Sequence, residues 1–154
     1  MTIEQLLSEW AIDSKIDPLK IEATIREIPS LHNKYLTFLV YENRKLRKLE
    51  RERNSLVQLR TEYFYGDTLD NVELAAIRAK SKYPDSWHPF ARRLVKTEIS
   101  RFVDNAPDVQ DITEEYGEQK QVVDALTLIL KEIMQRNFHL RAIIDYKKFQ
   151  EAVN

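Results

Sequence analysis

The stretch ENRKLRKLERERNSLVQLRTEYFYG, residues 42–66, decides the fold because it holds no proline and no glycine before its last residue. Leu46, Leu49 and Leu56 share one face at about 100° per residue, which predicts an amphipathic helix that ends at Gly66. Seven side chains of the stretch are Arg or Lys. Four of these cations lie on the face opposite the leucines, with no acid among them: Arg44, Arg47, Lys48 and Arg51.

The helix is predicted to begin well before this stretch. Ser30 is a suitable N-cap, and Pro29 is expected to end the segment before it. From Leu31 to about Phe64 the chain has no Gly or Pro. At ~1.5 Å per residue such a helix is about 50 Å long. A helix of this length needs partners along its length, so we expect a bundle or an oligomer.

Two short helices are expected ahead of the long one. Thr2 and Gln5 have the spacing of a capping box, and apolar residues follow at helical intervals. Asp17 followed by Pro18 predicts the start of a second helix, which runs to Pro29.

The chain after Gly66 divides into a basic middle and an apolar end. We expect a weak helix over 68–82, a loop over 83–89 and a further helix over 90–103. The last third, 108–154, predicts helices that are buried on two sides, with a kink at 136–138. It is the expected assembly surface, through Val122, Leu126, Ile129, Leu130, Ile133, Phe138, Ile143 and Phe149.

The predicted fold class is therefore all-α, a helical bundle with one long helix. A single domain is expected over 1–154. Its parts are short N-terminal helices (1–29), the long basic helix (30–66), the basic middle segment (67–107) and the apolar C-terminal helices (108–154).

Several function classes are excluded by composition and spacing. The chain has no Cys and only two Gly, which rules out thiolate metal sites and a glycine-rich phosphate loop. The three His are far apart and belong to no metal or catalytic motif, so we expect neither an enzyme nor a metal or other cofactor. The absence of a signal peptide and of a membrane-spanning run predicts a cytoplasmic protein.

Charge is distributed unevenly along the chain. The net charge is −1 overall, but residues 44–101 carry 14 basic and 8 acidic side chains. The segments before and after this middle are both net negative. Such a basic middle is able to bind an anionic partner or to pair with the acidic ends of neighbouring subunits.

The cations of the long helix are interleaved with aromatic residues, a pattern typical of single-stranded nucleic-acid binding. No duplex-reading motif is present, so we expect contacts to the backbone without sequence preference. One alternative remains open, a structural coiled-coil scaffold with a solvated charged face. An amphipathic membrane helix is disfavoured, because the heptad-like apolar face rich in Leu and Tyr is explained by coiled-coil packing. The candidate DNA-binding residues are Arg44, Lys45, Arg47, Lys48, Arg51, Arg53, Arg60 and Tyr63.

The order and spacing of several segments resemble the UvsY recombination mediator family of T-even-type bacteriophages, including its cyanophage relatives. The resemblance covers nearly the whole chain. The segments that carry it are LLSEWAIDSKID (6–17), IPSLHNKYL (28–36), LRTEYFYG (59–66), WHPFARRLVKTEI (87–99), DNAPDV (104–109) and RNFHLRAIIDYKKFQEA (136–152).

This resemblance implies a small, non-enzymatic helical protein that assembles into a homo-oligomeric ring, a hexamer or heptamer. It implies binding to single-stranded DNA coated by the phage single-strand-binding protein, in the cytoplasm of the infected bacterium. It further implies loading of the RecA-like recombinase UvsX and contacts with both of these protein partners. No membrane partner is implied.

The family's DNA-binding motif falls at the end of the long helix. Arg60 matches its arginine, whereas Gln58 stands where the family pattern has a lysine. Arg51 and Arg53, one to two turns upstream, are expected to compensate for the missing charge.

Overall fold

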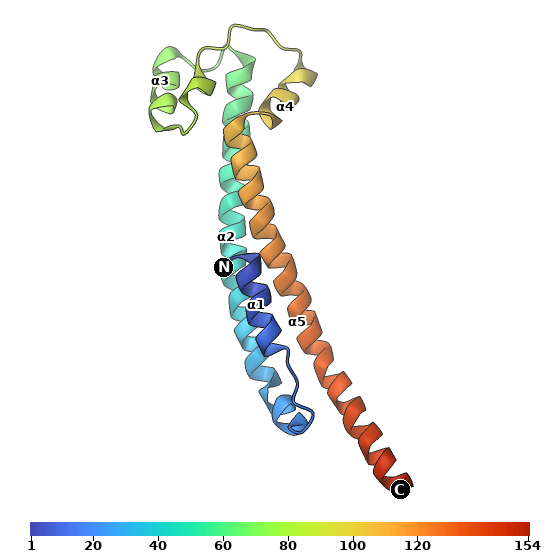
Figure 1. Cartoon of the computed structure of the whole chain (residues 1–154). Coiled ribbons are helices and arrows are strands. Elements are labelled where there is room, and N and C mark those ends of the chain that lie inside the picture. Colours follow the sequence, from blue (N-terminus) through green and yellow to red (C-terminus); the bar gives the residue numbers. More distant parts are fainter. The chain divides into compact units, whose positions relative to one another are not determined.

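The computed structural model describes all 154 residues and confirms the all-α fold class (Figure 1). It contains five α-helices, one 3-10 helix and no strand. The helices are α1 (Ile3–Asp13), α2 (Ile21–Tyr65), α3 (Asn71–Lys80), η1 (Pro84–Trp87), α4 (Lys96–Asp104) and α5 (Pro107–Val153).

The chain forms two compact units. Unit 1 comprises Met1–Lys45 with Glu118–Asn154, and unit 2 comprises Leu46–Gly117. Helices α2 and α5 each contribute residues to both units. Each unit has a hydrophobic core of its own.

Helix α2 is longer than predicted, because it starts at Ile21 and continues through Pro29. The prediction that Pro29 separates two helices is therefore wrong. Proline removes one backbone donor from the helix, but Ile28 and Leu31 on either side of it pack against the core of unit 1. Asp17 caps a turn ahead of the helix, where its carboxylate accepts the backbone N–H of Leu19 at 2.9 Å.

Helix α5 is a single helix of 47 residues, which continues without interruption through the predicted kink position at 136–138. Its first residue is Pro107, where the missing N–H would have no partner inside the helix in any case. No further proline follows in this helix, and Arg136 and Leu140 are both buried within unit 1. Packing at the start of the RNF sequence and just after it therefore favours a continuous helix there.

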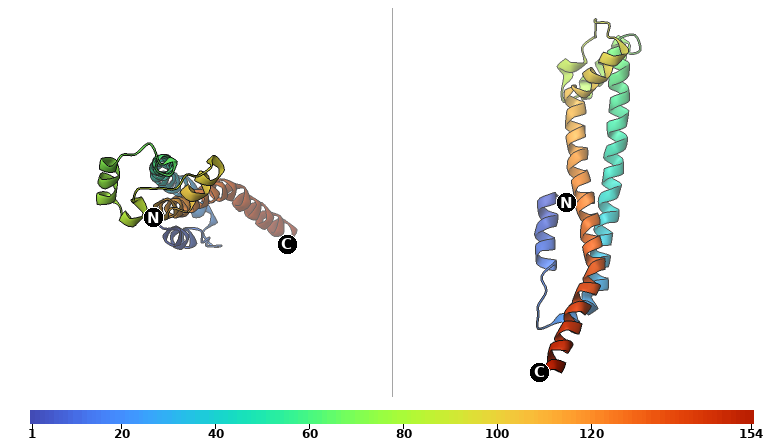
Figure 2. Two further views of the ribbon diagram at one scale, coloured as in Figure 1. Left: turned by 90° about the horizontal axis from the view of Figure 1, so that it is seen from above. Right: turned by 90° about the vertical axis from the view of Figure 1, so that its right-hand side faces the viewer.

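Unit 1 packs α1 against the first half of α2 and the second half of α5 (Figure 2). Tyr35 lies at its centre, in edge-to-face contact with Trp10 at 5.4 Å and Phe38 at 5.6 Å between ring centroids. The predicted capping box of α1 is confirmed, since Thr2 and Gln5 exchange both hydrogen bonds. The other buried core residues are Leu6, Val122, Leu126, Ile129, Leu130 and Ile133.

A polar cluster closes the end of α1. The Tyr35 hydroxyl donates to Asp13 at 2.9 Å, and Lys34 donates to the same carboxylate at 2.6 Å. Burial, with this hydrogen bond, raises the pKa of Tyr35, and the hydrogen bond to Asp13 raises the pKa of Lys34. Arg136 of α5 donates to the carbonyl of Ser14 at 2.8 Å, which fixes α5 to the end of α1.

Unit 2 builds its core from the end of α2, the start of α5 and the short elements between them. Gly66 ends α2 as predicted, with a φ of +86° that a side chain would strain. The helix predicted over 90–103 begins only at Lys96, and Phe90 and Leu94 pack on the core outside any helix. The buried core residues are Tyr63, Phe64, Leu74, Trp87, Ile99, Val103, Ala106 and Val109.

Acid sensitivity of unit 1 is predicted to depend on Glu42, whose side chain is only 2% exposed. Burial acts to raise the pKa of Glu42, but hydrogen bonds from Gln119 and Lys45 outweigh it, so the pKa lies below its ordinary value. A carboxylate of this kind stabilises the fold above an unfolded pKa of 4.5. That contribution is lost as the pH falls through the lower folded value.

We therefore expect Glu42→Gln to lower the thermal midpoint at neutral pH and to lose less stability than the wild type on acidification to about pH 3. Calorimetry at the two pH values measures both effects. An equal loss in the two proteins would show that other carboxylates control the acid transition.

Candidate nucleic-acid interface

Three cations on the α2 part of unit 2 point to solvent, as the helical spacing predicts. Arg47, Lys48 and Arg51 are all exposed. Arg47 and Arg51 have no carboxylate within 4.0 Å, and Lys48 has only a long contact of 3.8 Å to Glu52. The guanidinium groups of this face are therefore free to donate hydrogen bonds to phosphate oxygens.

The two cations that precede them belong to unit 1 and differ from each other. Arg44 is exposed and has no ion pair. Lys45 is half-buried, donates to Glu42 at 3.2 Å and lies 4.8 Å from the centre of the Tyr41 ring. Arg44 is thus available to an anion, whereas Lys45 already neutralises a buried carboxylate.

Arg53 lies on the opposite side of α2, against α5. Its side chain is half-buried, and its Nε donates to the Thr113 hydroxyl at 3.1 Å. The contact joins the two long helices within unit 2.

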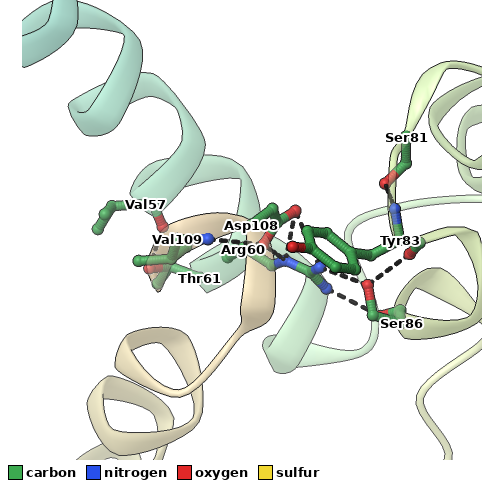
Figure 3. Close-up of polar contacts among 8 residues, drawn as sticks. All are labelled: Val57, Arg60, Thr61, Ser81, Tyr83, Ser86, Asp108 and Val109. Atoms are coloured by element: carbon green, nitrogen blue, oxygen red, sulfur yellow. Dashed lines mark hydrogen bonds and ion pairs between the residues drawn. The ribbon is translucent and has the colours of Figure 1, made fainter. Parts of the chain in front are cut away.

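Arg60 is buried, with only 1% of its surface exposed. Figure 3 shows its guanidinium between Asp108 and Ser86. Nε and Nη2 each donate to the Asp108 carboxylate at 2.9 Å. Nη1 donates to the Ser86 carbonyl at 2.8 Å, and Nη2 donates to the Ser86 hydroxyl at 2.7 Å.

The hydrogen bonds use the edge of the planar Arg60 guanidinium, and its face stacks on Trp87. Its Cζ lies 3.5 Å from the centre of the Trp87 ring, a close cation–π contact. Arg60 therefore ties together α2, η1 and the first turn of α5. Its guanidinium has no exposed face, so in this structure it offers no direct contact to DNA.

The aromatic side chains of unit 2 are mostly in the core. Tyr63 is buried, its hydroxyl donates to the His88 carbonyl, and its ring packs on Trp87 at 5.1 Å. Tyr65 is instead 51% exposed. Tyr65 is not among the predicted DNA-binding residues, although the period of 3.6 residues places it on the cationic face.

A second group of cations lies between Phe90 and the start of α4. Arg92, Arg93 and Lys96 are exposed and have no carboxylate within 4.0 Å. The Arg92 guanidinium lies 5.8 Å from the centre of the Phe102 ring. These residues continue the positive charge of unit 2 beyond α2.

The predicted assembly residues on α5 fall into two groups. Phe138, Ile143 and Phe149 are exposed, and the first and last of these are 73% and 66% exposed. The others face the core of unit 1 and are covered by the same chain: Val122, Leu126, Ile129, Leu130 and Ile133.

Two further observations concern other kinds of site. No group of three or more His, Cys, Asp or Glu side chains is arranged so that it could hold a metal ion. None of the helices has the length and apolar character needed to span a bilayer.

The sequence profile of the family described as recombination, repair and single-stranded-DNA-binding protein UvsY matches residues 9–153. No individual curated protein sequence matches the chain. The fold matches crystal structures of the recombination mediator protein UvsY of bacteriophage T4 in three lattices. The type II lattice gives a TM-score of 0.82 at 18% identity, covering 98% of each chain.

The other two lattices give similar values. Type IV has a TM-score of 0.76 at 19% identity and covers 97% of this chain and 99% of the other. Type I has a TM-score of 0.78 at 18% identity and covers 95% and 98%. At such identities the likeness establishes the fold, which agrees with the predicted all-α class.

We expect Arg60→Ala to destabilise unit 2 by about 3 kcal/mol, because it leaves Asp108 without its partner and Trp87 without its stacking cation. Arg60→Lys should restore little of this, since an ammonium cannot reproduce the fork of hydrogen bonds. Arg51→Ala is the matched control, and its exposed side chain predicts an unchanged thermal midpoint. Equal midpoints for Arg60→Ala and the wild type would contradict the structural role of Arg60.

Proposed function

The chain belongs to the UvsY family of recombination, repair and single-stranded-DNA-binding proteins, and from this premise we propose that it acts as a recombination mediator. In this proposal it binds single-stranded DNA, weakens the hold of the phage single-strand-binding protein and promotes loading of the RecA-like recombinase UvsX. The observation that carries the proposal is the exposed cationic face of α2, on which Arg47 and Arg51 have no carboxylate within 4.0 Å.

The DNA contact is proposed to lie on Arg47, Lys48 and Arg51 of unit 2. Cations that neutralise phosphates release condensed counterions, so the affinity depends steeply on salt. Nothing on this face reads base edges, because its side chains are flexible cations rather than a fixed set of donors and acceptors. Binding without strong sequence preference follows.

The buried members of the predicted set have a supporting role in this proposal. Arg53 and Arg60 hold α2 against α5, and Tyr63 holds the end of α2 against η1. They determine the direction in which the exposed cations point without touching the strand. In this proposal Arg60, which matches the arginine of the family motif, supports DNA binding by stabilising the fold of unit 2.

Oligomerisation is proposed to use the exposed apolar side chains of α5: Phe138, Ile143 and Phe149. Exposed aromatic residues on a helix whose other side is already packed are favoured contacts for a second copy of the chain. A ring of six or seven copies would repeat the cationic face, and each further engaged subunit would bind at high effective concentration. A strand drawn along such a ring is held away from the geometry that its coating protein prefers.

The DNA contact is tested by replacing Arg47, Lys48 and Arg51 together with Gln. We expect at least a tenfold loss of affinity for fluorescent oligo-dT at low salt. The slope of log affinity against log salt should fall by about 2, at roughly 0.7 for each lost phosphate contact.

The matched control replaces Lys15, Lys20 and Lys131 with Gln, because these exposed cations of unit 1 have no ion pair. It removes the same charge and should retain most of the affinity. A wild-type protein that fails to bind at low salt would instead support the scaffold function without DNA binding. Equal losses in the two variants would show that net charge, and not this face, governs binding.

Assembly is tested with Phe138→Ser combined with Phe149→Ser. Light scattering should show a lower oligomer mass, because two exposed aromatic contacts are lost, while the helix content stays unchanged. Val72→Ser with Val95→Ser, exposed apolar residues of unit 2, is the control. The dissociated variant should also lose the ability to displace the single-strand-binding protein; full displacement activity would contradict the multivalent mechanism.

A further inference from the structure

Tyr65 is the one exposed aromatic side chain of unit 2. The other aromatic residues there are buried or half-buried. Five of them pair with one another at ring-centroid distances of 4.9–6.1 Å: Tyr63, Phe64, Trp87, Phe90 and Phe102. Tyr65 takes part in no such pair, and its hydroxyl has no hydrogen bond within the chain.

Tyr65 lies on the same face of α2 as the free cations. Seven residues of an α-helix return to within about 20° of the starting direction. Arg51, Gln58 and Tyr65 are spaced by seven, so they form a row along the helix, and all three are exposed. At ~1.5 Å per residue the row is about 21 Å long.

The position of Tyr65 at the end of α2 leaves space around the ring. Helical side chains lean towards the N-terminus, so the ring is expected to lie over the turn that carries Gln58 and Thr61. After Tyr65 the chain turns away at Gly66, whose positive φ ends the helix. No later turn of α2 therefore covers the ring.

We propose that Tyr65 stacks on a base of the single strand whose phosphates are held by Arg47 and Arg51. This inference rests on the proposed function and adds a base contact to it. Single-strand-binding surfaces combine cations for the backbone with aromatic rings for the bases, and stacking is tolerant of sequence because every base has a π face. The row provides both kinds of group on one face of one rigid helix.

One acid lies on the path of the strand. Glu62 is half-buried on the same side of α2, between Gln58 and Tyr65, and has no cation within 4.0 Å. Its carboxylate would repel a phosphate that passes from Arg51 to Tyr65. In this proposal Arg51 holds the phosphate backbone at one end of the row, and Tyr65 contacts a base at the other end.

The test compares oligo-dT with a strand of equal length whose sugars carry no bases. Tyr65→Ala should weaken binding to oligo-dT by about fivefold or more, the low end of measured base stacking, and leave binding to the abasic strand unchanged. Tyr65→Phe should keep the wild-type affinity for both strands. Tyr146→Ala, at an exposed tyrosine of α5, is the matched control and should change neither.

Glu62→Gln is expected to raise the affinity for DNA, a result that misfolding of the variant would not produce. It should strengthen binding to both strands at low salt, since one repulsive charge is removed. Equal affinity of Tyr65→Ala and the wild type for oligo-dT overturns the stacking inference alone. Failure of the wild type to bind either strand overturns the proposed function itself.

Discussion

The buried pair of Arg60 and Asp108 is the constraint on which unit 2 depends. A charged group taken out of water is costly unless it is paired and its donors are satisfied. Here the carboxylate, the Ser86 backbone and the Trp87 ring surround the guanidinium, and each comes from a different position along the chain. Only one relative placement of α2, η1 and the start of α5 satisfies all of them, so the pair selects that placement.

The same helix separates its cations into two kinds by their angular position alone. Arg53 and Arg60 are seven residues apart and face α5, whereas Arg44 and Arg51 are seven apart and face solvent. Arg60 is neutralised by Asp108 and Arg53 donates to the Thr113 hydroxyl, whereas the outward pair has no partner within the chain. Rigid packing on one side of α2 therefore fixes the direction of the cations on the other. In the proposed function, this reduces the entropy lost when a flexible strand is bound.

Periodicity and local chemistry were sufficient to predict the elements that depend on near neighbours in sequence. The long helix, the Thr2 capping box and the end at Gly66 follow from spacing. The burial of Arg60 does not, because its partners lie 26 and 48 residues away. The same holds for Pro29 and for the unbroken α5, where tertiary packing outweighs the local preference to stop. Tyr63 is buried by tertiary packing that sequence alone does not reveal, whereas the helical period already places Tyr65 on the exposed cationic face.

The apolar character of α5 illustrates why composition alone leaves assembly open. A helix that is apolar on more than one side must be covered on each of them. Within unit 1, α1 and α2 cover the side that carries Leu126 and Ile133, and the exposed Phe138 and Phe149 stay in solvent. Only the second group is available to another copy of the chain. In the proposed mediator, that surface and the α2 face act together. A helix face with a few cations releases a strand easily, and repetition by assembly makes it competitive with a coating protein.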